Sequence, residues 1–210
     1  SIMTKRPAGG AQMSATDAQK MVVGEGRTML NAEIQDDLIL AHQSDWAGSS
    51  QSDYAWAAKR AAQRDGMVNL NPYEQQQVDR LARQYGNRWD DMVETASRMQ
   101  QYQRTRVGRI VDPNRLVTVY RGVKLPDQGW TVGQLVDFDG GALSSWSLNK
   151  GTASSFAHPH SPGQVGYVLE SRVRAMDISG SGMLNGMGTF EEVVLYGGNR
   201  QAKVLDVRRR

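Results

Sequence analysis

Three segments in the second half of the sequence carry guanidinium, hydroxyl and carboxylate groups that could do chemistry. The first is Tyr120-Arg121-Gly122, at the end of the β-branched run 116–120. An arginine at the end of a strand can hold a phosphate through two parallel hydrogen bonds, and a glycine after it lets a ligand approach the backbone closely. An ordinary ion pair at a strand end explains the same residues, so Arg121 alone does not define a site.

The other two segments are rich in hydroxyl and carboxylate groups. The segment 144–147, Ser-Ser-Trp-Ser, is expected to be a turn that leads into a helix, where a helix cap is the structural alternative to a binding role. Glu191 and Glu192 lead into an apolar strand, and strand alternation places them on opposite faces. One of them therefore points toward the core or a cleft, where a carboxylate needs hydrogen-bond partners or a function.

The composition excludes several kinds of site. The 210 residues contain no cysteine, which excludes disulfides, thiolate catalysis and sulfur-bound zinc or iron–sulfur centres, and three histidines are too few for a self-contained metal site. The net charge is +3 with one dense basic run, 208–210, which predicts a solvated tail and not a nucleic-acid-binding face. No apolar run approaches the length of a transmembrane helix, and 1–19 lacks the apolar stretch of a signal peptide.

The hydrophobic pattern divides the chain into a helical first half and a strand-rich second half. Apolar residues recur at helical spacing in four segments, at 29–41, 54–64, 73–85 and 87–99. Asn71-Pro72-Tyr73-Glu74 is a strong helix start, with a capping residue, a proline and a glutamate in the expected order. After Pro113 we expect short strands at 116–120, 131–138, 164–173, 191–196 and 203–207, and one short helix at 148–157. This order predicts an α+β fold.

Taken in order, the three segments resemble the arginine–serine–glutamate family of mono-ADP-ribosyltransferases, and most of all the ADP-ribosylating toxin domains of bacteria. In this family an aromatic–arginine pair lies on the first core strand, a serine segment runs into a helix, and a glutamate immediately precedes apolar strand residues. The matching residues here are Tyr120-Arg121, then Ser145-Trp146-Ser147-Leu148-Asn149-Lys150 with Ala153 and Phe156, and then Glu192-Val193-Val194-Leu195. The resemblance covers about 117–207.

The resemblance implies an NAD-dependent transferase, a glycosyltransferase that cleaves NAD at the nicotinamide–ribose bond and passes ADP-ribose to a macromolecular target. NAD is its co-substrate, and no metal is expected. The implied fold is an N-terminal helical lobe packed on a mixed or antiparallel β-sandwich core. The implied organisation is a disordered leader or linker at 1–19, the helical lobe at 20–112 and the NAD-binding catalytic core at 113–210, together one compact domain.

The resemblance also assigns roles to individual residues. Glu192 holds a ribose hydroxyl and stabilises the oxocarbenium-like transition state, Ser145 positions Glu192, and Arg121 holds an NAD phosphate. The residues that complete the NAD site in this assignment are Gly122, Ser147 and Phe156.

Two departures from the family pattern bear on the acceptor. Trp146 stands where the family usually has threonine, and Phe190 stands two residues before Glu192, where the family generally has glutamate or glutamine. Phe190 and its neighbour Glu191 are therefore the candidates for the acceptor side of the site.

The expected partners follow from the same resemblance. A protein acceptor is expected rather than a nucleic acid, because the sequence has no basic stripe with interleaved aromatic residues. An immunity or antidote protein is a further expected partner, and no membrane is. The chain suits a toxin or effector domain, delivered as part of a larger secreted or injected protein into the cytoplasm of a target cell. An NAD glycohydrolase, or an inactive binding module with the same fold, are the alternatives.

Overall fold

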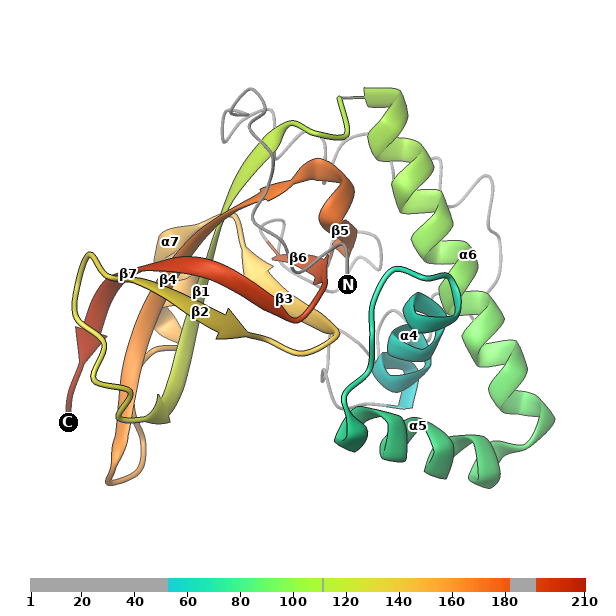
Figure 1. Cartoon of the computed structure of the whole chain (residues 1–210), viewed down its shortest axis with the longest axis horizontal. Coiled ribbons are helices and arrows are strands. Elements are labelled where there is room, and N and C mark those ends of the chain that lie inside the picture. The colour runs from blue at the N-terminus through green and yellow to red at the C-terminus, as the bar shows by residue number, and fades with distance from the viewer. Residues whose placement is uncertain (1–52, 111, 182–191) are drawn as a thin grey trace.

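The computed structural model describes residues 53–110, 112–181 and 192–210, which form an α+β fold (Figure 1). The helices are α4 (Asp53–Arg64), α5 (Pro72–Tyr85), α6 (Asn87–Ile110) and α7 (Lys150–Ser155), with a 3-10 turn, η2, at Ala175–Asp177. The strands are β1 (Leu116–Pro126), β2 (Leu135–Asp139), β3 (Leu143–Ser147), β4 (Gln164–Arg174), β5 (Ile178–Ser181), β6 (Glu192–Tyr196) and β7 (Asn199–Arg208). The predicted α+β class is confirmed, whereas the predicted leader at 1–19 and helix at 29–41 lie outside the described residues.

The start of α5 shows how closely the local sequence determines these helices. The side chain of Asn71 accepts the Glu74 N–H at 2.8 Å, and the Glu74 side chain accepts the Asn71 N–H at 3.1 Å, so the predicted capping box is present. Gly86 ends the helix with a φ of 57°, in the left-handed region that favours glycine. In the part of the chain that the structure describes, no helix is long and apolar enough to cross a membrane.

The strands differ from the predictions at three places. The segment 144–147 lies inside β3 and is not a turn, because its residues pair in register with β6. Residues 178–181, which lie outside every predicted strand, form β5 at the edge of the sheet. The strand predicted at 131–138 begins only at Leu135, because the chain turns at Gly133, where φ is 89°.

Within the described residues, the seven strands form one sheet in the order β2-β7-β4-β1-β3-β6-β5, and every pair is antiparallel. Strand β1 pairs with β4 along its full length, from Leu116 to Pro126. In contrast, β1 pairs with β3 at one position, Tyr120 opposite Ser147. The sheet therefore has two parts, β2-β7-β4-β1 and β3-β6-β5, which diverge on both sides of this pair.

Both parts of the sheet contribute side chains to one core. Strand β1 alternates toward this core through Val117, Val119 and Val123, as expected for a strand with one buried face. Phe138 and Trp146 meet across the core with their ring centres 6.1 Å apart. Further large members of the cluster come from β2, β4, β5, β6 and β7, namely Val136, Val165, Tyr167, Leu169, Val173, Ile178, Val193, Leu195 and Val204.

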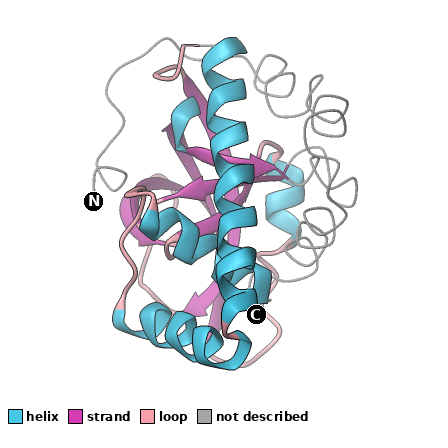
Figure 2. Ribbon diagram, turned by 90° about the vertical axis from the view of Figure 1, so that its right-hand side faces the viewer, coloured by secondary structure: helices cyan, strands magenta, loops and turns pink. Residues whose placement is uncertain are grey.

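The helical lobe, residues 53–110, packs against the opposite face of β3 and β6 (Figures 1 and 2). Leu143 of β3 and Val194 of β6 belong to the same apolar cluster as the alanine-rich face of α4 and the tryptophans of the lobe. Glu74 also links the lobe to the sheet, because its Oε2 accepts the backbone N–H of Ala142 at 3.0 Å, directly before β3. Both the lobe and the core therefore fix the position of β3.

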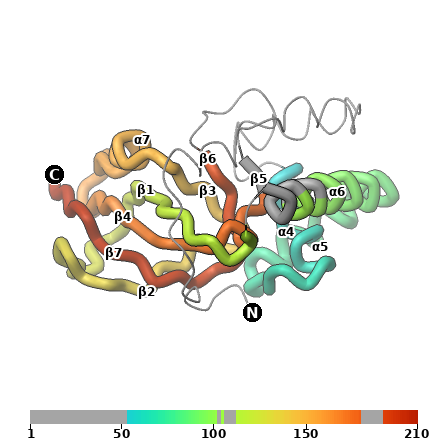
Figure 3. Tube along the Cα trace, turned by 90° about the horizontal axis from the view of Figure 1, so that it is seen from above, coloured from blue at the N-terminus to red at the C-terminus, as the bar shows by residue number. Residues whose placement is uncertain are grey.

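Helix α7 lies directly on β1, and the residues that follow it lie on β4, because each strand has a glycine at the point of contact (Figure 3). A Cβ atom at Gly122 would lie 1.9 Å from the carbonyl oxygen of Ala153, and one at Gly166 would lie 1.6 Å from that of Ala157. Any side chain at these two positions would push α7 outward. The two glycines thus set the height of α7 above the sheet.

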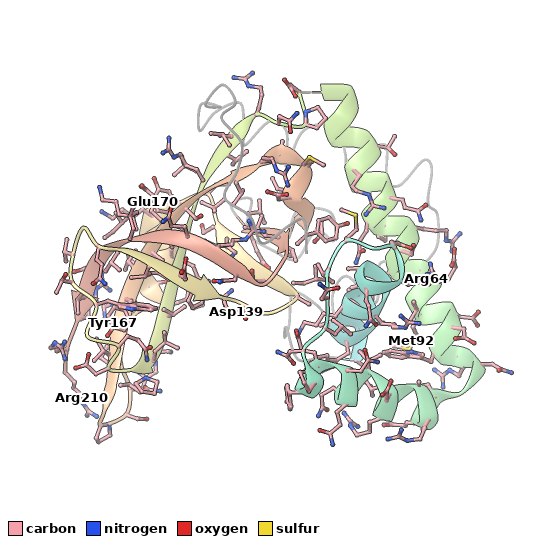
Figure 4. All side chains as sticks on the ribbon, in the orientation of Figure 1. Arg64, Met92, Asp139, Tyr167, Glu170 and Arg210 are labelled. Carbon is pink, nitrogen blue, oxygen red and sulfur yellow. The ribbon has the colours of Figure 1, made fainter. Side chains whose placement is uncertain are left out.

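The basic run 208–210 is predicted to be a solvated tail, and Arg209 and Arg210 are exposed beyond the last strand, as predicted, whereas Arg208 belongs to β7. Arg208 is the last residue of β7 and pairs with Gly166 of β4, which extends far enough to receive it. Arg209 forms an ion pair with Asp127, and this hydrogen-bonded guanidinium lowers the pKa of the Asp127 carboxyl to about 2. Figure 4 labels Arg210 and Tyr167 at this end of the sheet.

The close contacts of Gly122 and Gly166 with the segment above them give a stability prediction. We expect Gly166→Ala to lower the free energy of unfolding by about 2 kcal/mol or more, because the new methyl group overlaps the Ala157 carbonyl. Gly151→Ala, inside α7 itself, is the matched control, since a Cβ there would contact only the Asn149 side chain, at 3.1 Å, and would not overlap a backbone carbonyl of another segment. Urea unfolding curves measure the free energy of unfolding of both variants. Equal stability of the two variants would contradict the claim that close packing requires glycine at position 166.

Candidate active site

A cavity of about 330 Å³ opens where β1 and β3 diverge, beneath α7. This volume lies in the range of small-molecule sites in proteins. Its walls come from β1, β3, α7, the residue after α7 and the first residue of β6. The lining residues are Tyr120, Arg121, Gly122, Ser145, Trp146, Ser147, Thr152, Ala153, Phe156 and Glu192. The cavity therefore brings together all six predicted site residues that the structure describes.

The strand register explains why four of these side chains share one side of the sheet. Glu192 of β6 lies opposite Ser147 of β3, and Ser147 lies opposite Tyr120 of β1. Residues directly opposite one another in neighbouring strands point to the same face. Ser145 is two residues from Ser147 and joins them on that face.

Ser145 and Glu192 are in direct contact within the cavity. The Ser145 hydroxyl donates to Glu192 Oε1 at 3.2 Å, and both residues are half-buried. A hydrogen bond from the hydroxyl orients a carboxylate. The position of the Glu192 side chain therefore depends on β3 as well as on β6.

The Trp146 side chain points away from Ser145 and Glu192. This orientation explains how a tryptophan can stand where the family pattern usually has threonine. Its indole is buried in the core beside Phe138, and its Nε1–H donates to the Ser144 hydroxyl at 2.9 Å. Strand alternation sends residues 145 and 147 to one face and 144 and 146 to the other. A large aromatic residue at 146 thus fills the core and leaves the serine face unchanged.

Arg121 reaches the site from the core face of β1. Its guanidinium carbon lies 5.4 Å from the centre of the Phe138 ring, and burial lowers the pKa of the guanidinium. Among the residues described, none pairs with its buried Nη1 atom, and no carboxylate forms an ion pair with it. The buried positive charge is therefore not neutralised by the described part of the chain.

Gly122 and Phe156 form the side of the cavity nearest α7. The sequence predicts that a ligand can approach the Gly122 backbone closely, and in the structure the group that lies against this glycine is the Ala153 carbonyl of α7. Phe156 is the residue that ends α7, and 60% of its surface is exposed at the cavity rim. An exposed aromatic ring at the rim of a cavity can cover a bound planar group.

The structure also adds residues that the sequence did not assign to the site. The cavity is also lined by Tyr120, Thr152 and Ala153. Tyr120 lies there because it pairs with Ser147, and the two α7 residues lie there because the helix packs closely on Gly122. The alternation of β1 would have placed Tyr120 beside the serine face, had its register with β3 been known. The predicted acceptor-side residues, Phe190 and Glu191, lie outside the described residues.

Strand β6 is anchored at its other end by Tyr196. Its buried hydroxyl accepts a hydrogen bond from Arg104 Nη1 of α6 at 2.6 Å, and burial raises the pKa of this phenol to about 12. Tyr196 and Glu192 share a face of the five-residue strand, four positions apart. The lobe therefore holds one end of the strand whose other end reaches the cavity.

Comparison with known proteins found no relative. No family model, no curated protein and no solved structure matches the chain. Within 53–110, 112–181 and 192–210, no group of three or more histidine, aspartate and glutamate side chains is placed to hold a metal ion.

The anchor on β6 gives a second stability prediction. We expect Tyr196→Phe to lower the free energy of unfolding by about 1–2 kcal/mol, because Arg104 loses its acceptor in a buried setting. Tyr73→Phe is the control, since 59% of Tyr73 is exposed, and its effect should stay within about 0.5 kcal/mol. Denaturant unfolding measures the stability of both variants. An unchanged midpoint for Tyr196→Phe would contradict the claim that the Arg104–Tyr196 hydrogen bond stabilises the fold.

Proposed function

We propose that this chain is a mono-ADP-ribosyltransferase domain of the toxin or effector kind, which cleaves NAD and transfers ADP-ribose to a protein. The observation that carries the proposal is the contact between Ser145 and Glu192 inside a cavity that also holds Arg121. These are the three residues that the resemblance names, and they come from three different strands. We also propose that the two parts of the sheet, packed around one core, are an ADP-ribosyltransferase-type β core.

Glu192 is the catalytic residue in this proposal. When the bond between nicotinamide and ribose breaks, positive charge develops on the ribose, and a fixed negative charge beside it stabilises that state. Glu192 is half-buried and oriented by the Ser145 hydroxyl, so little reorganisation is needed as the charge develops. Ser145 acts through Glu192 and is a positioning residue.

Arg121 supplies the opposite charge. A buried guanidinium without a described carboxylate partner favours an anion nearby, because interactions between charges are strong in a poorly hydrated interior. The diphosphate of NAD is such an anion. Gly122 and Ser147 line the cavity between the two charges, and Phe156 at the rim covers the bound substrate.

The proposal extends to partners and setting. The acceptor is a protein, the domain is cargo of a larger secreted or injected protein that acts in the cytoplasm of a target cell, and an immunity protein covers the cavity in the producing cell. The resemblance supports these statements. The described structure adds one supporting observation, an open cavity with an aromatic residue exposed at its rim.

The catalytic assignment gives an activity prediction. Glu192→Gln should slow the release of nicotinamide from NAD by at least about 100-fold, because it removes the charge that stabilises the transition state. Its affinity for NAD should change only several-fold, since the diphosphate is bound elsewhere in the cavity. Glu94→Gln, a change in an exposed ion pair of the helical lobe, is the control and should retain activity.

Nicotinamide release and NAD binding are measured separately, by chromatography and by calorimetry. Turnover of Glu192→Gln at the rate of the unmodified protein would contradict the assignment. Covalent ADP-ribose on protein, detected with labelled NAD, then separates a transferase from a glycohydrolase that uses water as the acceptor.

A further inference from the structure

The guanidinium of Arg121 lies against an aromatic ring and not against a carboxylate. Its central carbon is 5.4 Å from the centre of the Phe138 ring, near the end of β2. Among the ion pairs of the described residues, none includes Arg121. The face of an aromatic ring attracts a cation without carrying a net charge, and this attraction is stronger where water is excluded. Phe138 can therefore hold the guanidinium in place and leave its positive charge available to an anionic ligand.

Trp146 packs against the ring that contacts the guanidinium. It meets Phe138 edge to face, with an angle of 77° between the ring planes, an arrangement that aromatic pairs favour. The indole N–H donates to the Ser144 hydroxyl, so a rotation of the indole would break a buried hydrogen bond. The tryptophan that departs from the family pattern thus braces the ring beside Arg121.

Gly140 leaves room for the same guanidinium. A Cβ atom there would lie 3.2 Å from Arg121 Nη1 and 3.0 Å from the Ser144 hydroxyl oxygen. Contacts as short as these force the neighbouring groups to move. Gly140 follows Phe138 by two residues, with Asp139, which Figure 4 labels, between them. The end of β2 therefore supplies the ring, and the residue after it leaves the space that the guanidinium needs.

A fixed guanidinium matters because arginine has a long and flexible side chain. Ordering such a side chain on binding costs conformational free energy, and a side chain that is ordered beforehand avoids that cost. Arg121 lines the cavity, and its Nη1 atom is already buried in the absence of a ligand. A guanidinium held in one orientation can donate to two phosphate oxygens at once.

We propose that Phe138 is a positioning residue, which presents the Arg121 guanidinium to the diphosphate of NAD. Trp146 and Gly140 support it, the first by bracing the ring and the second by leaving the guanidinium its space. This inference rests on the proposed function, in which Arg121 binds that diphosphate. Glu192 is oriented from the opposite face of β3, through its own hydrogen bond to a serine. Loss of the Phe138 ring should therefore weaken NAD binding and leave the cleavage step unchanged.

The test uses the full chain and two ligands, NAD and ADP, of which ADP carries the diphosphate without nicotinamide. Nicotinamide release gives kcat and KM for NAD, and calorimetry gives Kd for ADP. Phe138→Leu keeps an apolar side chain in the core but removes the ring face, so KM and Kd should each rise about fivefold or more. The kcat at saturating NAD should stay within about twofold, as expected for a loss of binding alone.

Gly140→Ala tests the same claim without removing any part of the core. The φ angle of Gly140 is not in the left-handed region, so the new methyl group crowds the guanidinium without straining the backbone. We expect KM for NAD and Kd for ADP to rise about threefold or more in this variant.

Val136→Ala is the matched control, because Val136 is buried in the same strand and the same apolar cluster as Phe138. It also removes apolar volume from the core, and it should leave KM and Kd unchanged. Unchanged constants in Phe138→Leu and Gly140→Ala, an equal rise in Val136→Ala, or a fall in kcat alone would overturn the inference.

The two ligands separate a failure of this inference from a failure of the proposed function. If the unmodified protein binds ADP but releases no nicotinamide, the proposed function fails, and the Kd values of the variants for ADP still decide the positioning role. If the protein binds no ADP and releases no nicotinamide, both fail.

Discussion

One registered pair, Tyr120 opposite Ser147, joins the two parts of the sheet, and the candidate site depends on it. Because β1 and β3 pair there and diverge on either side, the backbone leaves a gap that α7 roofs and side chains line. The same pair aligns Glu192 with β1 through Ser147. If the strands paired along their length, as β1 and β4 do, the sheet would be continuous and the cavity would close.

Two supports keep this junction in place. On one side, Gly122 and Gly166 allow α7 to lie on the sheet at backbone distance, which fixes the roof. On the other side, the helical lobe holds β3 through the Glu74 carboxylate before its first residue, and β6 through Tyr196. The lobe is therefore part of the site's support although it does not line the cavity. Its helices support the strands, whereas β1 and β6 contribute the charged side chains of the site and β3 contributes its serine hydroxyls.

The sequence predicted the type of most elements because their signals are local. The capping box at Asn71 and the alternation of β4 act within a few residues. It mistook 144–147 for a turn because a strand of serines shows its alternation only through its partner, β6. It also could not place Tyr120 beside Glu170, since this follows from pairing between distant segments. Trp146 departs from the family pattern, which usually has threonine at this position, and its place in the core explains why the tryptophan fits.

The central claim is that the gap between β1 and β3 binds NAD, and a binding measurement without turnover tests it most directly. A carbocyclic analogue of NAD, whose nicotinamide bond cannot be cleaved, is titrated into the isotope-labelled protein while backbone amide signals are recorded by NMR. The account predicts saturable shifts centred on Gly122, Ser145, Ser147 and Thr152, with the amides of α5 unaffected. An absence of shifts at millimolar analogue, or shifts confined to surfaces away from this cavity, would contradict it.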